Sequence, residues 1–108
     1  MGITKSDLFN TEQNELATMA KVLGHPARIA ILDYLVKTNV CINGHLVEEL
    51  GLAQATISQH LKELKSAGLI KGTIEGKAMC YCINPEVWAA FKNTLEGFFN
   101  QFDENSCC

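Results

Sequence analysis

Five cysteines are the side chains of this sequence with the most reactive chemistry. They fall into three groups along the 108 residues: Cys41 alone, Cys80 and Cys82 two positions apart, and the terminal pair Cys107 and Cys108. Thiolates bind soft ions such as Cu(I), Zn(II) and, by extension, trivalent arsenic or antimony. Paired thiols also oxidise reversibly. The sequence therefore offers two kinds of thiol chemistry, ion binding and redox exchange.

Two arrangements would bring three of these thiols together. Cys80 and Cys82 lie in a β-prone run, where residues two apart face the same side of a strand. Met79, Tyr81 and Ile83 fit the core side of this run, which leaves Cys80 and Cys82 on the more exposed side. A neighbouring strand that contains Cys41 would complete a site within one subunit, and this is the arrangement we favour. In the alternative arrangement, Cys41 meets Cys107 and Cys108 from the same chain or from a second copy.

Catalytic chemistry finds little support in the residues. A cysteine nucleophile needs a histidine and an orienting group beside it, but His25, His45 and His60 are scattered and no motif places any of them by a thiol. The chain has no glycine-rich phosphate loop, no paired carboxylates at useful spacing, and no HxxxH pattern for a nitrogen-rich zinc site. We therefore predict that the protein is not an enzyme and has no small-molecule substrate.

Residues 44–70 predict a helix-turn-helix. Leu46 and Leu50 give a short first helix its apolar face, and Gly51 suits the left-handed conformation that ends a helix. A second helix is expected from about Gln54 to Ala67. Two helices joined by a tight turn that contains glycine form a motif whose second helix can lie in the major groove of DNA.

The outward face of this second helix is polar but nearly uncharged. Ile57, Leu61 and Leu64 follow the helical spacing i, i+4, i+7 and are expected to turn inward. The outward residues are mostly short donors and acceptors, of the kind that contact base edges and phosphates, with Thr56 and His60 at the margins. On pattern alone, the alternative is a neutral surface helix in a helical bundle. The candidate contacts to bases and phosphates are Gln54, Thr56, Ser58, Gln59 and His60.

A predicted β-hairpin follows the motif directly. Two β-prone runs, residues 70–74 and 77–83, are separated by Glu75 and Gly76, which suit a tight turn. A helix-turn-helix followed by a hairpin is the winged-helix arrangement, in which the wing adds contacts beside the groove. Residues 54–77 carry a net charge of +2, although the whole chain carries −3, so positive charge gathers where DNA would lie. The candidate contacts to the DNA backbone are Lys62, Lys65, Lys71 and Lys77.

These motifs together resemble the arsenic-repressor (ArsR-type) family of winged-helix metalloregulators. The resemblance is carried by GLAQATISQHLKELKSAGLI, by EGK and YCINPE after it, and by LGHPARIAILDYL before it. It covers roughly Leu16 to Trp88. It implies a repressor that binds a double-stranded DNA operator as a homodimer and changes its DNA affinity with a ligand. It also implies a structural or DNA-backbone role for Arg28.

The sequence departs from the family pattern at the thiols. Arsenic-binding members of that family carry a Cys-x-Cys pattern at the entry to the third helix. In this sequence only Cys41 stands in the corresponding stretch, and the loop there is one residue longer than in the family pattern. The resemblance implies As(III), Sb(III) or another soft metal ion as effector, and no cofactor is expected for folding. The candidate ligands are Cys41, Cys80 and Cys82, with Cys107 and Cys108 as the alternative.

Two further helices are predicted before the motif. Thr11 or Asn10 can cap a first helix that ends at Gly24. Pro26 suits the first position of a second helix, whose residues are apolar almost all round, so we expect this helix at the centre of the core. Residues 40–42 are a candidate strand beside the wing.

A last helix is predicted from the Asn84-Pro85 pair onward. Its large apolar residues fall at 88, 91, 95, 98 and 102, a heptad-like spacing. They form more apolar surface than a small monomer usually leaves exposed. We therefore favour a dimer interface built with the first helix over a helix that folds back onto its own core, and the resemblance implies the same. The candidate interface residues are Leu16, Trp88, Phe91, Leu95, Phe98 and Phe102.

The composition fits a single globular domain. Apolar residues make up 47% of the chain and charged residues 19%. We expect a polar tail at 1–10, the domain at 11–102 and a cysteine-containing tail at 103–108. No segment reaches the ~20 apolar residues that span a bilayer, and the N-terminus lacks a hydrophobic signal core, so we expect a cytoplasmic protein without membrane contact. An odd number of cysteines in that reducing compartment argues against a structural disulfide framework.

The predicted fold is mainly α with a small β-wing, a winged helix-turn-helix that dimerises through its first and last helices. The predicted function is a homodimeric transcriptional repressor, released from DNA by a thiophilic ion bound to cysteine thiolates. One alternative is a repressor with a cysteine redox switch. Another is a winged-helix module that binds protein and has no effector, because a fold alone does not fix function.

Overall fold

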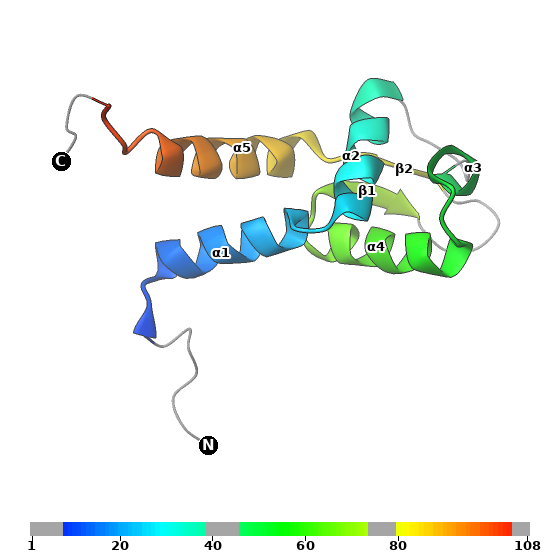
Figure 1. The fold of residues 1–108 in the computed structure, drawn as a ribbon, viewed down its shortest axis with the longest axis horizontal. Coiled ribbons are helices and arrows are strands. Elements are labelled where there is room, and N and C mark those ends of the chain that lie inside the picture. Colours follow the sequence, from blue (N-terminus) through cyan, green and yellow to red (C-terminus); the bar gives the residue numbers. More distant parts are fainter. Residues whose placement is uncertain (1–7, 39–45, 74–79, 105–108) are drawn as a thin grey trace, which may run out of the picture.

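In the part of the chain that the structure describes, helices pack against a two-stranded sheet. The computed structural model describes residues 8–38, 46–73 and 80–104. The predicted strand at 40–42 and the hairpin tip at Glu75 and Gly76 lie outside these ranges. Within them, the elements follow in the order α1 (Thr11–Leu23), α2 (Pro26–Thr38), α3 (Leu46–Leu50), α4 (Gln54–Ser66), β1 (Ile70–Thr73), β2 (Cys80–Ile83) and α5 (Pro85–Phe99) (Figure 1).

Asparagine side chains fix the first turns of α1 and α5. The side chain of Asn10 accepts a hydrogen bond from the backbone N–H of Gln13 at 2.7 Å, and the Gln13 side chain accepts one from the Asn10 N–H at 3.1 Å. This reciprocal capping box satisfies two N–H groups that have no partner within the helix. Asn84 similarly accepts from the N–H groups of Glu86 and Val87 at the start of α5. The predicted beginnings of the first and last helices are confirmed.

α2 contributes to the core from one side only. Ile31, Leu32 and Leu35 are buried, whereas Ile29 and Val36 on another side of the helix are 49% and 47% exposed. The expectation that α2 lies at the centre of the core is therefore wrong for the side of the helix that carries Ile29 and Val36. Burying a Leu or Ile side chain contributes about 1.5–3 kcal/mol. The buried apolar residues of the core are Ile31, Leu32, Leu35, Leu46, Ile57, Leu61, Leu64, Leu69, Ile70, Tyr81 and Phe91.

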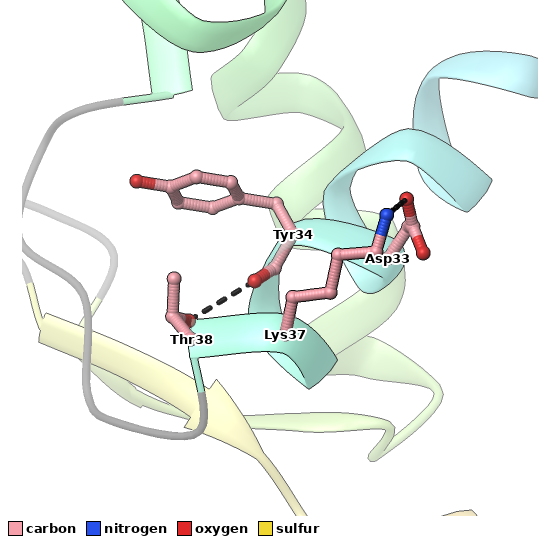
Figure 2. A network of polar contacts seen from close by, with 4 residues as sticks. All are labelled: Asp33, Tyr34, Lys37 and Thr38. Atoms are coloured by element: carbon pink, nitrogen blue, oxygen red, sulfur yellow. Dashed lines mark hydrogen bonds and ion pairs between the residues drawn. The ribbon is translucent and has the colours of Figure 1, made fainter.

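Short-range polar contacts close the last turn of α2 (Figure 2). The Thr38 hydroxyl donates hydrogen bonds to the backbone carbonyls of Tyr34, at 3.0 Å, and Leu35, at 3.3 Å. The Leu35 carbonyl is one of those at the end of a helix that lack a helical partner. Lys37 and Asp33 form an ion pair at 3.0 Å, with both side chains exposed. Such a surface pair contributes only about 0.3–0.5 kcal/mol, so the hydroxyl is the more important of the two contacts.

β1 and β2 form an antiparallel hairpin in which one face is buried. The register pairs Ile70 with Ile83 and Lys71 with Cys82. Side chains alternate across a strand, so Ile70 and the fully buried Tyr81 face the core while Lys71 is exposed on the other face. This alternation agrees with the prediction that Tyr81 and Ile83 face the core. The chain therefore has the predicted winged helix-turn-helix fold, mainly helical with a two-stranded wing.

α1 and α5 extend to the same side of the molecule, away from α3 (Figure 1). The two helices contact one another. Large apolar side chains remain exposed here, among them Phe98, Phe99 and Phe102. Phe98 and Phe99 make an edge-to-face contact with ring centroids 5.3 Å apart.

Gly72→Ala is expected to disrupt the wing. Gly72 has φ +117°, and a Cβ there would overlap the carbonyl oxygen of Cys80 and lie 2.9 Å from the Cα of Tyr81. These atoms belong to the paired strand, which cannot yield without loss of its pairing, so we expect a loss of roughly 3 kcal/mol in the free energy of unfolding.

Gly51→Ala is the matched control for strain without overlap, because Gly51 has φ +68° and its Cβ would meet open space. It should cost only about 1 kcal/mol. Urea unfolding of the wild type and both variants measures the difference. Equal destabilisation by the two substitutions would contradict the steric explanation.

Candidate nucleic-acid interface

The orientation of α4 is set by its apolar stripe. Ile57, Leu61 and Leu64 are buried in the core, which α2 and β1 share with α4. Gly51 ends α3 in the left-handed conformation, and the chain turns into α4 after Ala53. Alanine has no side chain to cap a helix, so the first N–H groups of α4 are left to solvent or to an anion such as a DNA phosphate.

The opposite face of α4 presents exposed amides and hydroxyls. Gln54 donates a hydrogen bond to the hydroxyl of Ser58 at 3.1 Å, and Gln59 donates one to the carboxylate of Glu63 at 3.2 Å. Both pairs lie four residues apart, one above the other along the helix. Because these contacts are at the surface, water competes with them and exchanging them for contacts to base edges costs little. Thr56 is also exposed on α4.

The lysines predicted to contact the DNA backbone lie on α4 and on the wing. Lys62 and Lys65 are exposed on α4, and Lys71 is exposed on β1. Lys77 lies outside the described residues. The structure thus leaves three of the four predicted cations accessible around the C-terminal half of α4 and the strand that follows it.

His60 is the exception among the predicted contacts on α4. Only 8% of its surface is exposed, because it follows Ile57 by three residues and lies on the buried side of the helix. The Nδ1 atom of His60 accepts a hydrogen bond from the Nε of Arg28 on α2 at 3.3 Å. The prediction that His60 lies at the margin of the outward face is therefore wrong. Arg28, which the sequence placed only near the start of its helix, is its partner.

The described cysteines lie on β2. Cys80 and Cys82 are partly buried and, being two apart, face the same side of the strand, away from Tyr81. Cys82 is a free thiol, whereas Cys80 is disulfide-bonded. This bond stands against the expectation, drawn from the odd number of cysteines, that the chain has no structural disulfide framework. Cys41, Cys107 and Cys108 lie outside the described residues. No group of three metal-binding side chains occurs within the described ranges.

The predicted interface residues lie on α1, on α5 and just beyond the end of α5, and they differ in exposure. Trp88, Phe98 and Phe102 are exposed, Phe102 at 73%, and Leu16 and Leu95 are partly buried. Phe91 is instead packed in the core of its own subunit. The prediction that Phe91 is available to a partner is therefore wrong, because this residue faces inward where α5 passes over the core. None of the described helices is long and apolar enough to cross a membrane.

The elements and their order define a winged helix-turn-helix protein, a class in which many members bind DNA. The model of the bacterial regulatory protein family arsR matches residues 25–71. An arsenical resistance operon repressor of Staphylococcus xylosus is 32% identical over 94 residues, which cover 87% of this chain and 88% of that protein. The chain therefore belongs to the arsR family of bacterial regulatory proteins. This is a family of transcriptional regulators and not of enzymes, as the sequence predicts.

Two further comparisons show similarity to other transcriptional regulators. The crystal structure of the transcriptional repressor BigR from Xylella fastidiosa superimposes with a TM-score of 0.63 at 25% identity, and it covers 94% of this chain and 99% of that one. The HTH-type transcriptional regulator Rv0081 of Mycobacterium tuberculosis is 39% identical over 67 residues, which is 62% of this chain. The matched stretch spans only 59% of the length of Rv0081.

Gln59→Ala and Ser58→Ala are expected to weaken specific DNA binding without unfolding the protein. Gln59 is exposed and Ser58 is partly exposed, so each truncation should leave the melting temperature within about two degrees of wild type. Each lost contact to a base edge should cost about 1–3 kcal/mol of binding free energy.

Fluorescence anisotropy measures the DNA affinity of each variant for two duplexes. One is a duplex that the wild-type protein selects from a random pool, and the other is a scrambled duplex. Ser66→Ala is the control, since Ser66 is exposed at the far end of α4 and is not a predicted contact. Unchanged affinity of the Gln59 and Ser58 variants for the selected duplex would remove α4 as the element that reads bases.

Proposed function

We propose that the protein is a homodimeric transcriptional repressor that binds a two-part DNA operator through α4 and releases it when its thiols change state. One observation carries the proposal: α4 buries Ile57, Leu61 and Leu64 and leaves Gln54 and Gln59 on its outer face. A helix held in this way can enter a major groove with amides toward the base edges. A repressor acts where the DNA is, so we also propose a cytoplasmic location.

The apolar surface of α1 and α5 supports the proposed dimer. An apolar hollow of about 330 Å³ is lined by residues of both helices. Phe98 and Phe99 stand at this hollow and are 49% and 69% exposed. Contiguous aromatic surface of this kind marks an interaction site. A twofold axis through this surface would relate two copies of α4 and match two DNA half-sites.

Phe98→Asp is expected to convert the dimer into a folded monomer. Phe98 belongs to the exposed surface and not to the core, so a carboxylate there should disfavour association while secondary structure persists. Sedimentation velocity measures the mass, which should fall to that of one 11.9 kDa chain.

Val36→Asp is the control for this substitution, because Val36 is similarly exposed but lies on α2, outside the proposed interface. It should remain dimeric. A Phe98→Asp protein that stays a dimer would place the interface elsewhere.

The register of the wing supports a link between thiols and DNA. Lys71 lies directly opposite Cys82 in the hairpin, and both residues are on the face that turns away from the core. Directly opposed side chains in a sheet lie about 5 Å apart at their Cβ atoms. A change at the β2 thiols therefore occurs beside a lysine proposed to contact the DNA backbone.

Ion binding is the first form of this thiol control. Cys80 and Cys82 in their reduced state, together with Cys41, are proposed to bind As(III), Sb(III) or another soft ion, with Cys107 and Cys108 as the alternative ligands. Support comes from the preference of thiolates for soft ions and from the name of the S. xylosus relative, an arsenical resistance operon repressor. The ion must bind the DNA-free form more tightly, by a coupling free energy of about 1–3 kcal/mol.

A redox switch is the second form, and the disulfide at Cys80 favours it. Oxidation of two thiols by peroxide would form one S–S bond, and the two protons and two electrons released would reduce the peroxide to two water molecules. Cys80 would take part in this exchange, whereas the free thiol of Cys82 would not. Ion binding therefore requires the thiol of Cys82, whereas the redox switch does not.

Release of DNA from the fully reduced protein distinguishes the two forms. The complex with the selected duplex is titrated with arsenite, antimonite and Zn(II), and separately with hydrogen peroxide. For ion sensing we expect release by arsenite, and loss of that release in Cys41→Ser, Cys80→Ser and Cys82→Ser. For the redox switch we expect release by peroxide, lost in Cys80→Ser but retained in Cys82→Ser.

The terminal cysteines are tested by Cys107→Ser combined with Cys108→Ser. Loss of arsenite release in this variant, with normal release in Cys80→Ser, would move the ion to the alternative site. No release by any ion or by peroxide would contradict thiol control altogether. If the wild-type protein selects no duplex at all, the protein-binding winged-helix module becomes the better explanation of the fold.

A further inference from the structure

Three side chains form a polar junction between α1, α2 and α4. Arg28 of α2 donates from Nε to the Nδ1 of His60 on α4 at 3.3 Å. The His60 ring also contacts the ring of His25, with centroids 4.3 Å apart. His25 in turn accepts a hydrogen bond at Nδ1 from the N–H of Ala27 at 3.1 Å, in the first turn of α2. The junction therefore joins the start of α2 to the middle of α4.

Arg28 extends this junction to the end of α1. Its Nη1 donates to the carbonyl oxygens of Lys21, at 3.4 Å, and Val22, at 3.2 Å. Both carbonyls belong to the last turn of α1, where the helix dipole favours a cation, and the Lys21 carbonyl also accepts from the N–H of Gly24 at 3.1 Å. One guanidinium thus holds the end of α1 and a side chain in the middle of α4 at the same time.

The position of this contact matters because α1 and α4 have different proposed tasks. α1 belongs to the proposed dimer surface, and α4 is proposed to read the half-site. The separation of the two α4 helices in a dimer depends on how each is placed relative to its own α1. Two-part operators are read only when that separation matches the spacing of the half-sites.

We propose that Arg28 is a positioning residue that fixes α4 relative to α1 through a neutral His60, and so sets the half-site spacing that the dimer accepts. The proposal rests on the proposed function. It gives Arg28 a different role from a direct phosphate contact, because Nε and Nη1 are directed to groups inside the subunit. Arg28 is also partly buried, whereas Lys62 is exposed.

The junction depends on an uncharged His60. Its Nδ1 can accept from Arg28 only while it carries no proton. Burial lowers the pKa of His60 below its ordinary value of 6.5, and the neighbouring His25 and Arg28 lower this pKa further, while Glu63 acts in the opposite direction. These three side chains are the titratable or charged groups that act on His60 in the described residues. The neutral state is therefore the one that folding favours at neutral pH.

The sign of the pH effect follows from this lowered pKa. The unfolded protein binds a proton at His60 more readily than the folded one, so folding stability rises with pH in this range. The contribution of neutral His60 is complete above about pH 6.5 and is lost as the pH falls toward the lower folded pKa. Protonation replaces an accepted hydrogen bond by the repulsion of Arg28 from an imidazolium, which separates α4 from Arg28.

The test measures the half-site spacing that each variant prefers. A duplex selected by the fully reduced wild-type protein is rebuilt with its half-sites moved one to three base pairs closer or farther apart. Arg28→Met and His60→Leu each remove the contact, from opposite sides. We expect each to lose roughly tenfold or more in affinity for the native spacing while retaining affinity for scrambled DNA, so that the preference among spacings flattens. A role in stability alone would lower the melting temperature without changing this preference.

Salt dependence separates positioning from phosphate contact. If Arg28 positions α4, the slope of log affinity against log salt should be the same in Arg28→Met as in the wild type. Two results together would overturn the proposal and make Arg28 a phosphate contact. The slope would be lower in Arg28→Met by about one charge per subunit, and His60→Leu would keep the wild-type spacing preference. Lys37→Met is the matched control, since it removes a cation from an exposed site on the same helix.

His60→Asn tests the proton separately. The Asn side-chain oxygen can accept from Arg28 where Nδ1 does, but it does not titrate. We expect wild-type spacing preference in this variant, with a loss of affinity between pH 7 and 5.5 that is much smaller than in the wild type. An equal loss in both proteins would overturn the role of the proton. If Arg28→Met and His60→Leu both keep the wild-type spacing preference, the positioning role is overturned. If the wild-type protein selects no duplex at all, the proposed function on which this role rests is overturned instead.

Discussion

The packing of Ile57, Leu61 and Leu64 of α4 into the core shared with α2 determines which residues the protein presents outward. Rotation of α4 by a single residue, about 100°, would expose part of this stripe and bury amides such as that of Gln54. Each exposed leucine would then forfeit about 1.5–3 kcal/mol, and each buried unpaired amide would cost about 1–3 kcal/mol. The proposed reading face is therefore a consequence of core packing and needs no separate stabilisation.

The remaining surface divides into two regions with different chemistry. The wing continues the face of α4 with Lys71, beside the thiol of Cys82. α1 and α5 extend to the other side of the molecule, where α5 carries the exposed Phe98 and Phe99. A regulator with this layout would sense thiol state next to the DNA and assemble far from it. Arg28 and His60 are placed between the two regions, where a small shift of α4 relative to α1 alters the separation of two reading helices.

The sequence predicted the elements whose signals are local. Asn10 and Asn84 cap the helices that follow them, Gly51 ends α3, and the alternation around Tyr81 gave the buried face of the wing. Each of these depends on residues within a few positions. The burial of His60 was also encoded locally, since it follows Ile57 by three residues, but its polarity pointed to the outward face.

Contacts between residues that lie far apart in the sequence could not be predicted from the sequence. Arg28 and His60 are 32 positions apart, and nothing in either local pattern pairs them. Phe91 lies on the same heptad-like seam as Phe98, and only the packing of α5 over the core separates the buried residue from the exposed one.

A hydroxyl-radical footprint on a duplex selected by the wild-type protein tests the central claim, that a dimer reads two half-sites through α4. We expect two protected patches on one face of the duplex, related by twofold symmetry and centred about one helical turn or a multiple of it apart. A single patch, or uniform weak protection along the duplex, would contradict reading by paired α4 helices.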